Sequence, residues 1–257
     1  MENGLKQRLV NRLKQAGAYT VRVADPHVGF EHALEGKHPL EVWESCNSVV
    51  VFAVARPPEG NNTYIGTYAP WPEDRYLGPV PRDIQSADYA MERLAGLFVS
   101  SVILRGVVLL QTAGYSVWWG PVQAKLAAFE AGIGVYGRSG VIIHPELGNR
   151  MALGTILTDA VLEPDRRMEG FEPCKGCDLC IKACPARAYD PEKSYPHSWS
   201  RETCTARRAQ IEDQGFYCHN CFAVCPAGKY ADEELIRVGK AQSFFAPHRT
   251  SDRAPGI

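Results

Sequence analysis

The spacing of the cysteines constrains this chain more than any other feature of its sequence. All but one of its nine cysteines lie between residues 174 and 225. They follow the pattern C-x2-C-x2-C-x3-C-P, then a single cysteine, then C-x2-C-x3-C-P. A two-residue gap lets a tight loop turn successive sulfurs toward one centre, whereas a three-residue gap carries the next sulfur away along a starting helix. The spacing therefore predicts two metal–sulfur centres that share one short segment.

The first run has the spacing of bacterial two-cluster ferredoxins, in which three close thiolates bind one [4Fe–4S] cluster and the fourth binds a second cluster. Two such clusters need eight thiolates, and residues 174–225 contain eight cysteines. Because the last cysteine of each run binds the other cluster in such ferredoxins, two ligand sets are predicted. They are Cys174, Cys177, Cys180 and Cys225 for the first cluster, and Cys184, Cys204, Cys218 and Cys221 for the second.

Structural zinc and disulfide bonds are the alternatives for this segment. Zinc sites usually pair two C-x2-C knuckles, which fits poorly with a continuous three-cysteine run and two C-P endings. Disulfides need an oxidising compartment, and residues 1–17 contain no apolar stretch of the kind found in secretory signals. Iron–sulfur clusters are therefore favoured. The remaining cysteine, Cys46, precedes an apolar run and is expected to be a small buried residue.

Composition and charge place the chain among ordinary globular proteins. Its 257 residues allow one large domain or two modest ones, and 45% of them are hydrophobic. The net charge of −1 gives no electrostatic reason to expect nucleic acid or an anionic membrane as a partner. The most apolar window, residues 94–114, contains Arg105, and an arginine costs about 2.5–3.5 kcal/mol at a bilayer centre. We therefore expect a cytoplasmic protein that does not enter the membrane.

Hydrophobic periodicity predicts a mixed α/β chain before the cysteines. Leu5, Leu9, Leu13 and Ala16 recur at helical spacing, and Gly17 suits the end of that helix. Strands are predicted over residues 19–24, 47–55, 107–111 and 141–144, with the valine-rich run 47–55 buried on both faces. Further helices are predicted over residues 87–105, 122–131 and 231–240. The proline-rich stretch 56–81 is expected to be a loop.

A glycine-rich motif lies between the expected helix 122–131 and the expected strand 141–144. Residues 132–137 read Gly-Ile-Gly-Val-Tyr-Gly, which matches the dinucleotide fingerprint G-x-G-x-x-G. A Rossmann glycine turn follows a strand and opens a helix, whereas these glycines follow a helix and lead into a strand, so NAD binding is rejected. Two interpretations stay open: the glycines end the helix and form a turn, or they let the backbone press against a flat cofactor.

The region from Gly120 to Asp159, together with the two cysteine runs, resembles the epoxyqueuosine reductase family, whose corrinoid-using relatives are the reductive dehalogenases. The residues that carry the resemblance are Gly120-Pro121, Lys125, Ala131–Gly134, Gly137-Arg138, Ile142–Pro145, Leu147-Gly148, Gly154 and Leu157–Asp159. The resemblance implies an oxygen-sensitive cytoplasmic reductase of the α/β (α+β) class. In that family pattern, a nitroreductase-like domain over residues 1–168 would hold cobalamin, and a ferredoxin-like two-cluster [4Fe–4S] domain over residues 169–257 would pass electrons to the cobalt.

The chain departs from that family pattern at several positions. Trp118 stands where the family carries an acid that the resemblance implies to be the proton donor, and Ala124 replaces a glutamate. Arg138 and Ser139 replace the usual Lys-Asn pair. The sequence ends at Ile257, without the tRNA-grasping extension of the family. We therefore do not expect tRNA as a partner.

Three functions are consistent with these patterns. The first is a reductase in which two clusters pass single electrons from a donor such as ferredoxin or flavodoxin to cobalamin or to a small-molecule substrate held by the N-terminal domain. The second is an electron-transfer protein with no catalytic cofactor of its own, and the third is epoxyqueuosine reduction in tRNA. For the first function, the residues expected to line the cofactor are Gly134, Gly137, Arg138 and Ser139, and the candidate proton donors are Tyr89, Tyr115 and Tyr136.

Overall fold

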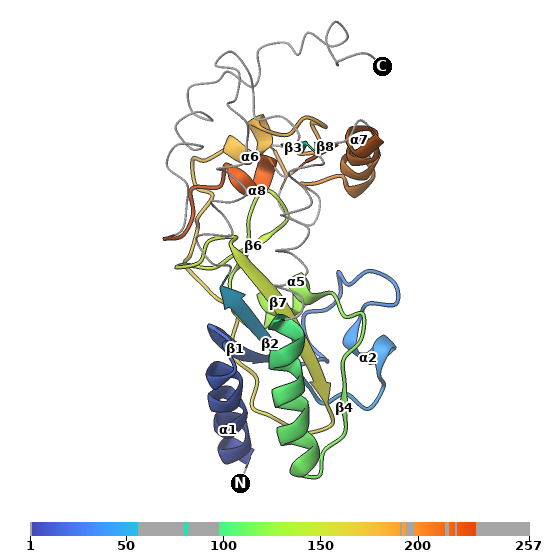
Figure 1. Ribbon diagram of the computed structural model, residues 1–257, viewed down its shortest axis with the longest axis vertical. Coiled ribbons are helices and arrows are strands. Elements are labelled where there is room, and N and C mark those ends of the chain that lie inside the picture. Colours follow the sequence, from blue (N-terminus) through green and yellow to red (C-terminus); the bar gives the residue numbers. More distant parts are fainter. Residues whose placement is uncertain are drawn as a thin grey trace, which may run out of the picture.

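The computed structural model describes residues 2–55, 80–81, 98–190, 192–193, 198–213, 216–218 and 220–229. In these residues the chain is a mixed α/β protein, with a sheet and its helices near the N-terminus and the cysteine-bearing helices at the opposite end (Figure 1). Several predicted features lie outside the described residues: the helix 231–240, the loop 56–81 apart from its last two residues, and residues 87–97 of the helix 87–105, which include Tyr89.

A four-stranded antiparallel sheet forms the centre of the described N-terminal part, with the strand order β1-β2-β7-β4. Its strands are β1 (Thr20–Ala24), β2 (Ser48–Ala55), β7 (Met151–Thr158) and β4 (Val117–Trp118). β2 pairs along its whole length with β7, from Ser48 opposite Thr158 to Ala55 opposite Met151. All residues of β2 except its last are buried, so the prediction of a strand buried on both faces is confirmed.

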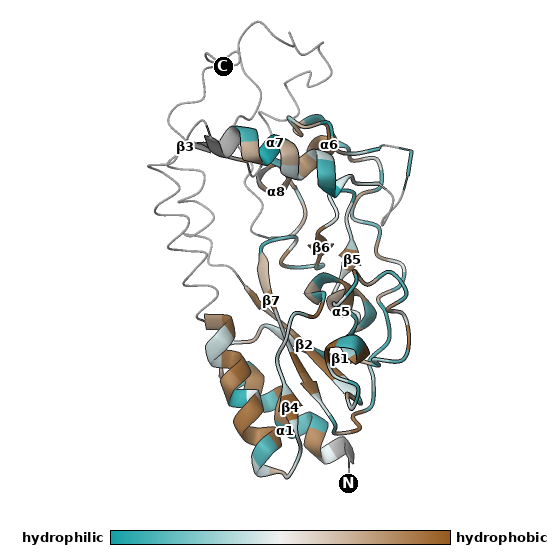
Figure 2. Ribbon diagram, turned by 90° about the vertical axis from the view of Figure 1, so that its right-hand side faces the viewer, coloured by the Kyte–Doolittle hydropathy of each residue, from teal (hydrophilic) through white to brown (hydrophobic). Residues whose placement is uncertain are grey.

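Alternation along β2 divides the core into two layers, because successive side chains of a strand point to opposite faces of the sheet. The even-numbered residues from Val50 to Val54 pack with α1 (Glu2–Gln15) and with a helix over residues 98–112. The odd-numbered residues from Val49 to Ala53 pack with α5 (Ala124–Glu130). Figure 2 shows α1 and α5 on opposite sides of the sheet.

The helix predicted at the N-terminus is confirmed as α1. Its Leu5, Leu9 and Leu13 are buried against the sheet, and Gly17 adopts φ +108° just after the helix ends. A second, short helix, α2 (Pro39–Val42), lies between β1 and β2 in the sequence. Its N-terminus is capped by His38, whose Nδ1 atom accepts a hydrogen bond from Leu40 N at 3.1 Å.

Residues 98–112 are helical, so the prediction of a strand over residues 107–111 is wrong. The valines and leucines of that stretch favoured a strand. Gly106 lies where the helix packs closely on β7, because a Cβ there would come within 2.6 Å of Ile156 Cδ1. Val102 and Leu110 are buried about one turn on either side, so the helical period continues through the apparent strand. Neither this helix nor any other in the described residues combines the length and the apolar composition that a bilayer crossing requires.

The glycine-rich motif connects α5 to a small hairpin. Gly132, at φ +73°, donates to Phe129 O at 3.0 Å, and Ile133 N donates to Ala128 O at 2.8 Å. This pair of hydrogen bonds is the Schellman motif that ends many helices, so the first glycine of the motif ends the helix and forms a turn. The strands β5 (Val135–Tyr136) and β6 (Ile142–Ile143) follow as an antiparallel pair. The predicted order of helix, glycines and strand is confirmed.

The elements of the cysteine-rich part are short. They are α6 (Leu179–Lys182), α7 (Arg201–Asp213), β8 (Phe216–Tyr217) and α8 (Asn220–Ala223). β8 pairs antiparallel with β3 (Val80–Pro81). Asn220 Nδ2 donates to Ala183 O at 3.2 Å, which joins the start of α8 to the end of α6. The two cysteine runs, far apart in the sequence, are thereby held side by side (Figure 1).

Candidate metal centre

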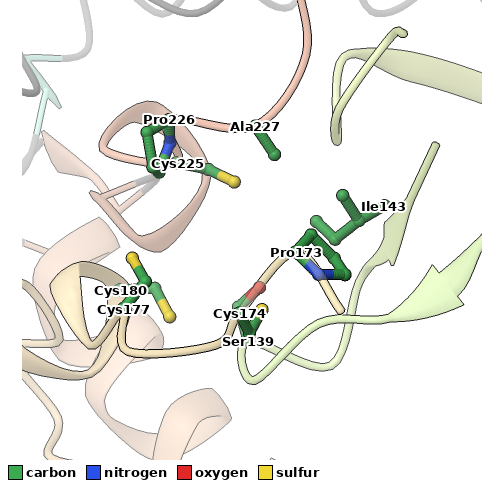
Figure 3. Close-up of a pocket in the computed structure, with 9 residues that line it drawn as sticks. All are labelled: Ser139, Ile143, Pro173, Cys174, Cys177, Cys180, Cys225, Pro226 and Ala227. Atoms are coloured by element: carbon green, nitrogen blue, oxygen red, sulfur yellow. The ribbon is translucent and has the colours of Figure 1, made fainter. Parts of the chain in front are cut away.

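The four cysteines predicted to bind the first cluster line one pocket (Figure 3). Cys174 and Cys177 come from the loop before α6, Cys180 comes from α6, and Cys225 comes from the turn after α8. The other lining residues are Ser139, Ile143, Pro173, Pro226 and Ala227. Within the described residues, no three His, Cys, Asp or Glu side chains converge as on a single metal ion. The four thiols surround a space instead, which is the arrangement that suits a cluster of several atoms.

The other four predicted ligands also lie near one another. Burial, with smaller effects of the neighbouring thiols of Cys184 and Cys204, raises the pKa of Cys218 to about 12 and that of Cys221 to about 11. Burial, with a smaller effect of Cys204, also raises the pKa of Cys184. Burial, with a smaller effect of Cys221, also raises the pKa of Cys180, which was assigned to the first cluster, so these effects do not divide the thiols into two sets. The assignment of Cys184, Cys204, Cys218 and Cys221 to a second cluster stays a prediction.

The surroundings of these thiols fit metal ligation. Arg138 N donates to Cys174 Sγ at 3.4 Å, and Ala188 N donates to Cys184 Sγ at 3.5 Å. Amide donors of this kind stabilise the negative sulfur of a thiolate. A buried thiol with a raised pKa stays protonated until a bound metal displaces its proton. All nine cysteines lie in the described residues, and none of them forms a disulfide. The donor set therefore fits thiolate ligation of iron–sulfur clusters.

Cys46 differs from the other cysteines. It lies in the core layer that contains α5, is 1% exposed, and has a pKa that burial raises to about 11. Its Sγ atom donates to Ser48 O at 3.4 Å. The prediction that Cys46 is a small buried residue is confirmed.

Arg138 and Ser139, which were expected to line a cofactor, lie at the first cysteine pocket. Ser139 is one of its lining residues, and Arg138 Nη1 donates to Cys177 O at 3.1 Å. The Tyr189 hydroxyl donates to Ser139 O at 3.3 Å and also lies within hydrogen-bonding reach of the Cys221 side chain. Tyr189, which no sequence motif singled out, therefore lies between the two groups of cysteines.

The two glycines expected to line the cofactor contact the hairpin. A Cβ on Gly134 would overlap the carbonyl oxygen of Ile143, and a Cβ on Gly137 would come within 2.9 Å of the Ile143 side chain. The same Cβ on Gly137 would lie 3.5 Å from Cys174 Sγ. In the described residues these glycines therefore permit the close approach of β6 and the cysteine loop, and their role in binding a cofactor stays a prediction.

The candidate proton donors with described positions are not brought together. Tyr115 packs in the core layer that contains α1, whereas Tyr136 packs in the layer that contains α5, with its ring centroid 5.4 Å from that of Phe129. Trp118, which stands where the resemblance implies an acid, lies on the edge strand β4 with 52% of its surface exposed. The described residues therefore assign no proton donor.

Sequence reasoning missed Arg150, the bulkiest of the fully buried side chains in the described residues. It directly precedes the apolar strand β7, and arginine is rarely fully buried unless it is paired. In the structure it is 2% exposed, and its Nη2 atom donates to Cys225 O at 3.1 Å. The polar pair Asn149-Arg150, placed between a glycine and a buried strand, is the signal that could have found it.

Comparisons with known proteins give two kinds of relative, although no family model matches the chain. An epoxyqueuosine reductase from Bacillus cereus is 25% identical over 245 residues, which cover 89% of this chain and 58% of that protein. A tetrachloroethene reductive dehalogenase from Desulfitobacterium hafniense is 33% identical over 119 residues, which cover 40% of this chain and 21% of that protein. The chain therefore spans little more than half the length of the first relative and a smaller share of the second.

Solved structures give the same two kinds of relative. An epoxyqueuosine reductase with an epoxyqueuosine-modified tRNA stem loop matches with a TM-score of 0.60 at 20% identity, over 93% of this chain and 69% of that chain. A reductive dehalogenase whose structure suggests a mechanism for B12-dependent dehalogenation matches with a TM-score of 0.61 at 22% identity, over 89% of this chain and 33% of that chain. At these identities the likeness concerns the fold alone. Sequence and fold agree that this chain is a relative of the epoxyqueuosine reductases and the reductive dehalogenases.

Proposed function

We propose that this chain is an iron–sulfur oxidoreductase that passes single electrons through two [4Fe–4S] clusters to a cofactor or substrate held by its N-terminal part. The observation that carries this proposal is the pocket lined by the four cysteines predicted for the first cluster, which lies against Arg138 and Ser139. Clusters bound only by thiolates can have reduction potentials of about −400 mV, which suits the reduction of difficult acceptors.

The positions of the two groups support a direction of electron flow. The second group includes Cys204 on α7, where residues 201–210 are exposed apart from Cys204 and Arg207. The first group lies against Ser139 and Ile143 of the N-terminal part. A donor such as ferredoxin or flavodoxin would therefore deliver electrons to the second cluster, and the first cluster would pass them to the acceptor.

Cobalamin is the acceptor that we propose, and its support comes from the B12-dependent relative. Bound cobalamin would supply a cobalt centre that changes its oxidation state. Gly134 and Gly137 lie against Ile143 of β6, and Arg138 Nη1 donates to Cys177 O, so a role of these residues in holding a corrinoid stays a prediction. A small-molecule substrate, the division into domains 1–168 and 169–257, and a cytoplasmic location stay predictions.

Iron and sulfide analysis of protein purified without air tests the clusters. We expect about eight iron atoms per chain for two [4Fe–4S] clusters. Cys225→Ala and Cys184→Ala should each lose about half of the iron, because each removes one ligand from a different predicted set. Cys46→Ala is the matched control and should retain the iron of the wild type. Zinc in place of iron, or unchanged iron in the Cys225 and Cys184 variants, contradicts the proposal.

Reconstitution with cobalamin tests the acceptor separately. We expect a corrinoid absorbance that stays with the protein after desalting and that is absent from a control sample of bovine serum albumin treated in the same way. Protein with two clusters and no retained corrinoid would remove cobalamin from the proposal and would favour an electron-transfer protein without a catalytic cofactor of its own.

Reduction of epoxyqueuosine in tRNA is a second candidate function, favoured by the length of the match. The Bacillus cereus epoxyqueuosine reductase aligns with 89% of this chain, against 40% for the dehalogenase. Our expectation that tRNA is not a partner finds no support, because a structural relative carries a tRNA stem loop. Expression in a strain that lacks epoxyqueuosine reductase tests this function: queuosine in the tRNA supports it, and persistent epoxyqueuosine contradicts it.

A further inference from the structure

The turn that carries Cys225 is held by a buried polar pair at the start of β7. Arg150 is 2% exposed and Asn149 is 3% exposed. Arg150 Nη2 donates to Cys225 O at 3.1 Å, and Arg150 Nη1 donates to Ala227 O at 3.3 Å. Asn149 Nδ2 donates to Phe222 O at 3.0 Å and its Oδ1 atom accepts from Arg150 Nη1 at 3.1 Å. The pair therefore binds three carbonyl groups on residues 222–227, on both sides of the last cysteine.

Cys225 needs such an anchor more than the other cysteines of its group. Cys174, Cys177 and Cys180 follow one another in a single loop and helix start, whereas Cys225 comes from a different element after α8. Its position therefore depends on tertiary contacts. The planar guanidinium of arginine offers several N–H donors in a fixed fork, which can hold two carbonyl groups at once.

The charge of Arg150 also acts on the same site. A guanidinium keeps its positive charge when buried, and buried charges are screened less by salt than exposed ones. Arg150 Nη2 lies 3.1 Å from Cys225 O, so this positive charge is held beside the backbone of a predicted ligand of the first cluster. One-electron reduction adds one negative charge to a thiolate-bound cluster. A fixed cation beside the cluster therefore favours the reduced state.

We propose that Arg150 is a positioning residue that holds Cys225 on the first cluster and raises the reduction potential of that cluster. This inference rests on the proposed function, because it requires the cluster to be bound. The second cluster should be affected less, since both hydrogen bonds from Arg150 to the cysteine segment reach the turn of Cys225.

The test uses the full chain, purified without air and containing its clusters. The variants are Arg150→Gln, which removes the charge, and Arg150→Lys, which keeps the charge but loses the fork. Arg12→Gln is the matched control, because Arg12 is an exposed arginine on α1. Iron content is measured for each variant, and both cluster potentials are measured by redox titration followed by electron paramagnetic resonance. Cys225→Ala and Cys184→Ala assign the signals to the first and second clusters.

We expect Arg150→Gln to favour the oxidised state of the first cluster by about tenfold, which is a shift of about 59 mV to more negative potential for one electron. Arg150→Lys should keep the potential of the wild type but release iron from the first cluster faster to a chelator, because the fork is lost. The control should match the wild type in both measurements.

Three results would overturn the inference. One is an unchanged potential in an Arg150→Gln variant that holds its iron. Another is an equal shift of both clusters. If Arg150→Gln does not bind iron, the lysine variant decides: a lowered potential, or wild-type iron release, contradicts the inference. Wild-type protein without clusters contradicts the proposed function itself. Wild-type protein with two clusters, together with Arg150 variants whose potentials and iron release are unchanged, contradicts only the role of Arg150.

Discussion

His144 accepts two backbone hydrogen bonds through one ring nitrogen. Its Nδ1 atom accepts from Glu146 N at 3.1 Å and from Leu147 N at 3.2 Å. Only an unprotonated Nδ1 can accept these bonds, and burial lowers the pKa of His144 from its ordinary value of 6.5. The turn that His144 shapes ends at Gly148, which contacts the turn of the last cysteine. Protonation of His144 should therefore loosen that contact.

We expect the wild type to lose stability as the pH falls below about 6.5. A group whose pKa is lowered by folding stabilises the protein fully above its unfolded pKa, and this stabilisation is lost as the pH falls through the folded pKa. His144→Asn should keep a turn acceptor that does not titrate. Its Tm should therefore fall less than that of the wild type between about pH 7.5 and about pH 5. The uptake of one proton by the unfolded wild type lowers its free energy of unfolding by up to about 1.4 kcal/mol per pH unit. His27→Asn, in an exposed turn, should behave like the wild type, and an equal fall in all three proteins contradicts the prediction.

Between elements, two glycines let the turn before β7 lie directly on the turn of the last cysteine. Gly148 has φ +61°, and a Cβ there would overlap the carbonyl oxygen of Ala227. Gly228 has φ +86°, and a Cβ there would overlap Gly148 N. Lys229 N continues the contact by donating to Glu146 O at 2.7 Å. This backbone contact leaves no space for a side chain at either glycine.

Gly148→Ala should therefore destabilise the protein more than an alanine at an open glycine. Gly36 is the matched control, because it has φ +68° and nothing within 4 Å of a Cβ. Gly36→Ala should cost about 1 kcal/mol for the left-handed backbone conformation. Gly148→Ala should cost about 1–3 kcal/mol more for the overlap with the backbone of Ala227. Chemical denaturation of both variants measures the difference, and equal costs would show that the contact yields without strain.

Across the whole molecule, the burial of apolar side chains is uneven. Both large core clusters consist of residues up to Leu162, on the two faces of the sheet. Beyond residue 168, the buried apolar side chains of the described residues are Leu179, Ile181, Ala183, Cys184, Ala188 and Val224. So little apolar burial supplies little stability. We expect the bound clusters to supply most of what holds the cysteine segment in place, as metal ligation does in other small domains.

Removal of the iron should therefore unfold the cysteine segment and leave the sheet intact. Hydrogen exchange measured before and after chelation checks this outcome. Peptides that contain residues 174–225 should lose protection, whereas peptides from β2 and β7 should keep it, because the two core layers do not depend on the clusters. Cys184→Ala should show a partial version of the same change without a chelator. Simultaneous loss of protection in β2 would mean that the whole chain folds around the metal.

Local pattern alone predicted much of this structure. The valine run predicted β2, the leucine spacing predicted α1, and the order of helix, glycines and strand was correct around Gly132. Cysteine spacing predicted which thiols gather, although their ligation awaits the iron assay. These features follow from the spacing of cysteines and the periodicity of apolar residues over short stretches of chain. Both can be read from the sequence without knowing which distant segments pack together.

Tertiary structure alone decided the rest. The contact with β7 decided that Gly106 lies inside a helix, and the turn of Cys225 covers Arg150, which no sequence pattern singled out. The four positions from Gly134 to Ser139 were expected to face a cofactor, and the described residues show them against the hairpin and the cysteines. In each case the outcome depends on which distant segment packs on a residue, since burial, close backbone approach and charge compensation are properties of both partners in a contact.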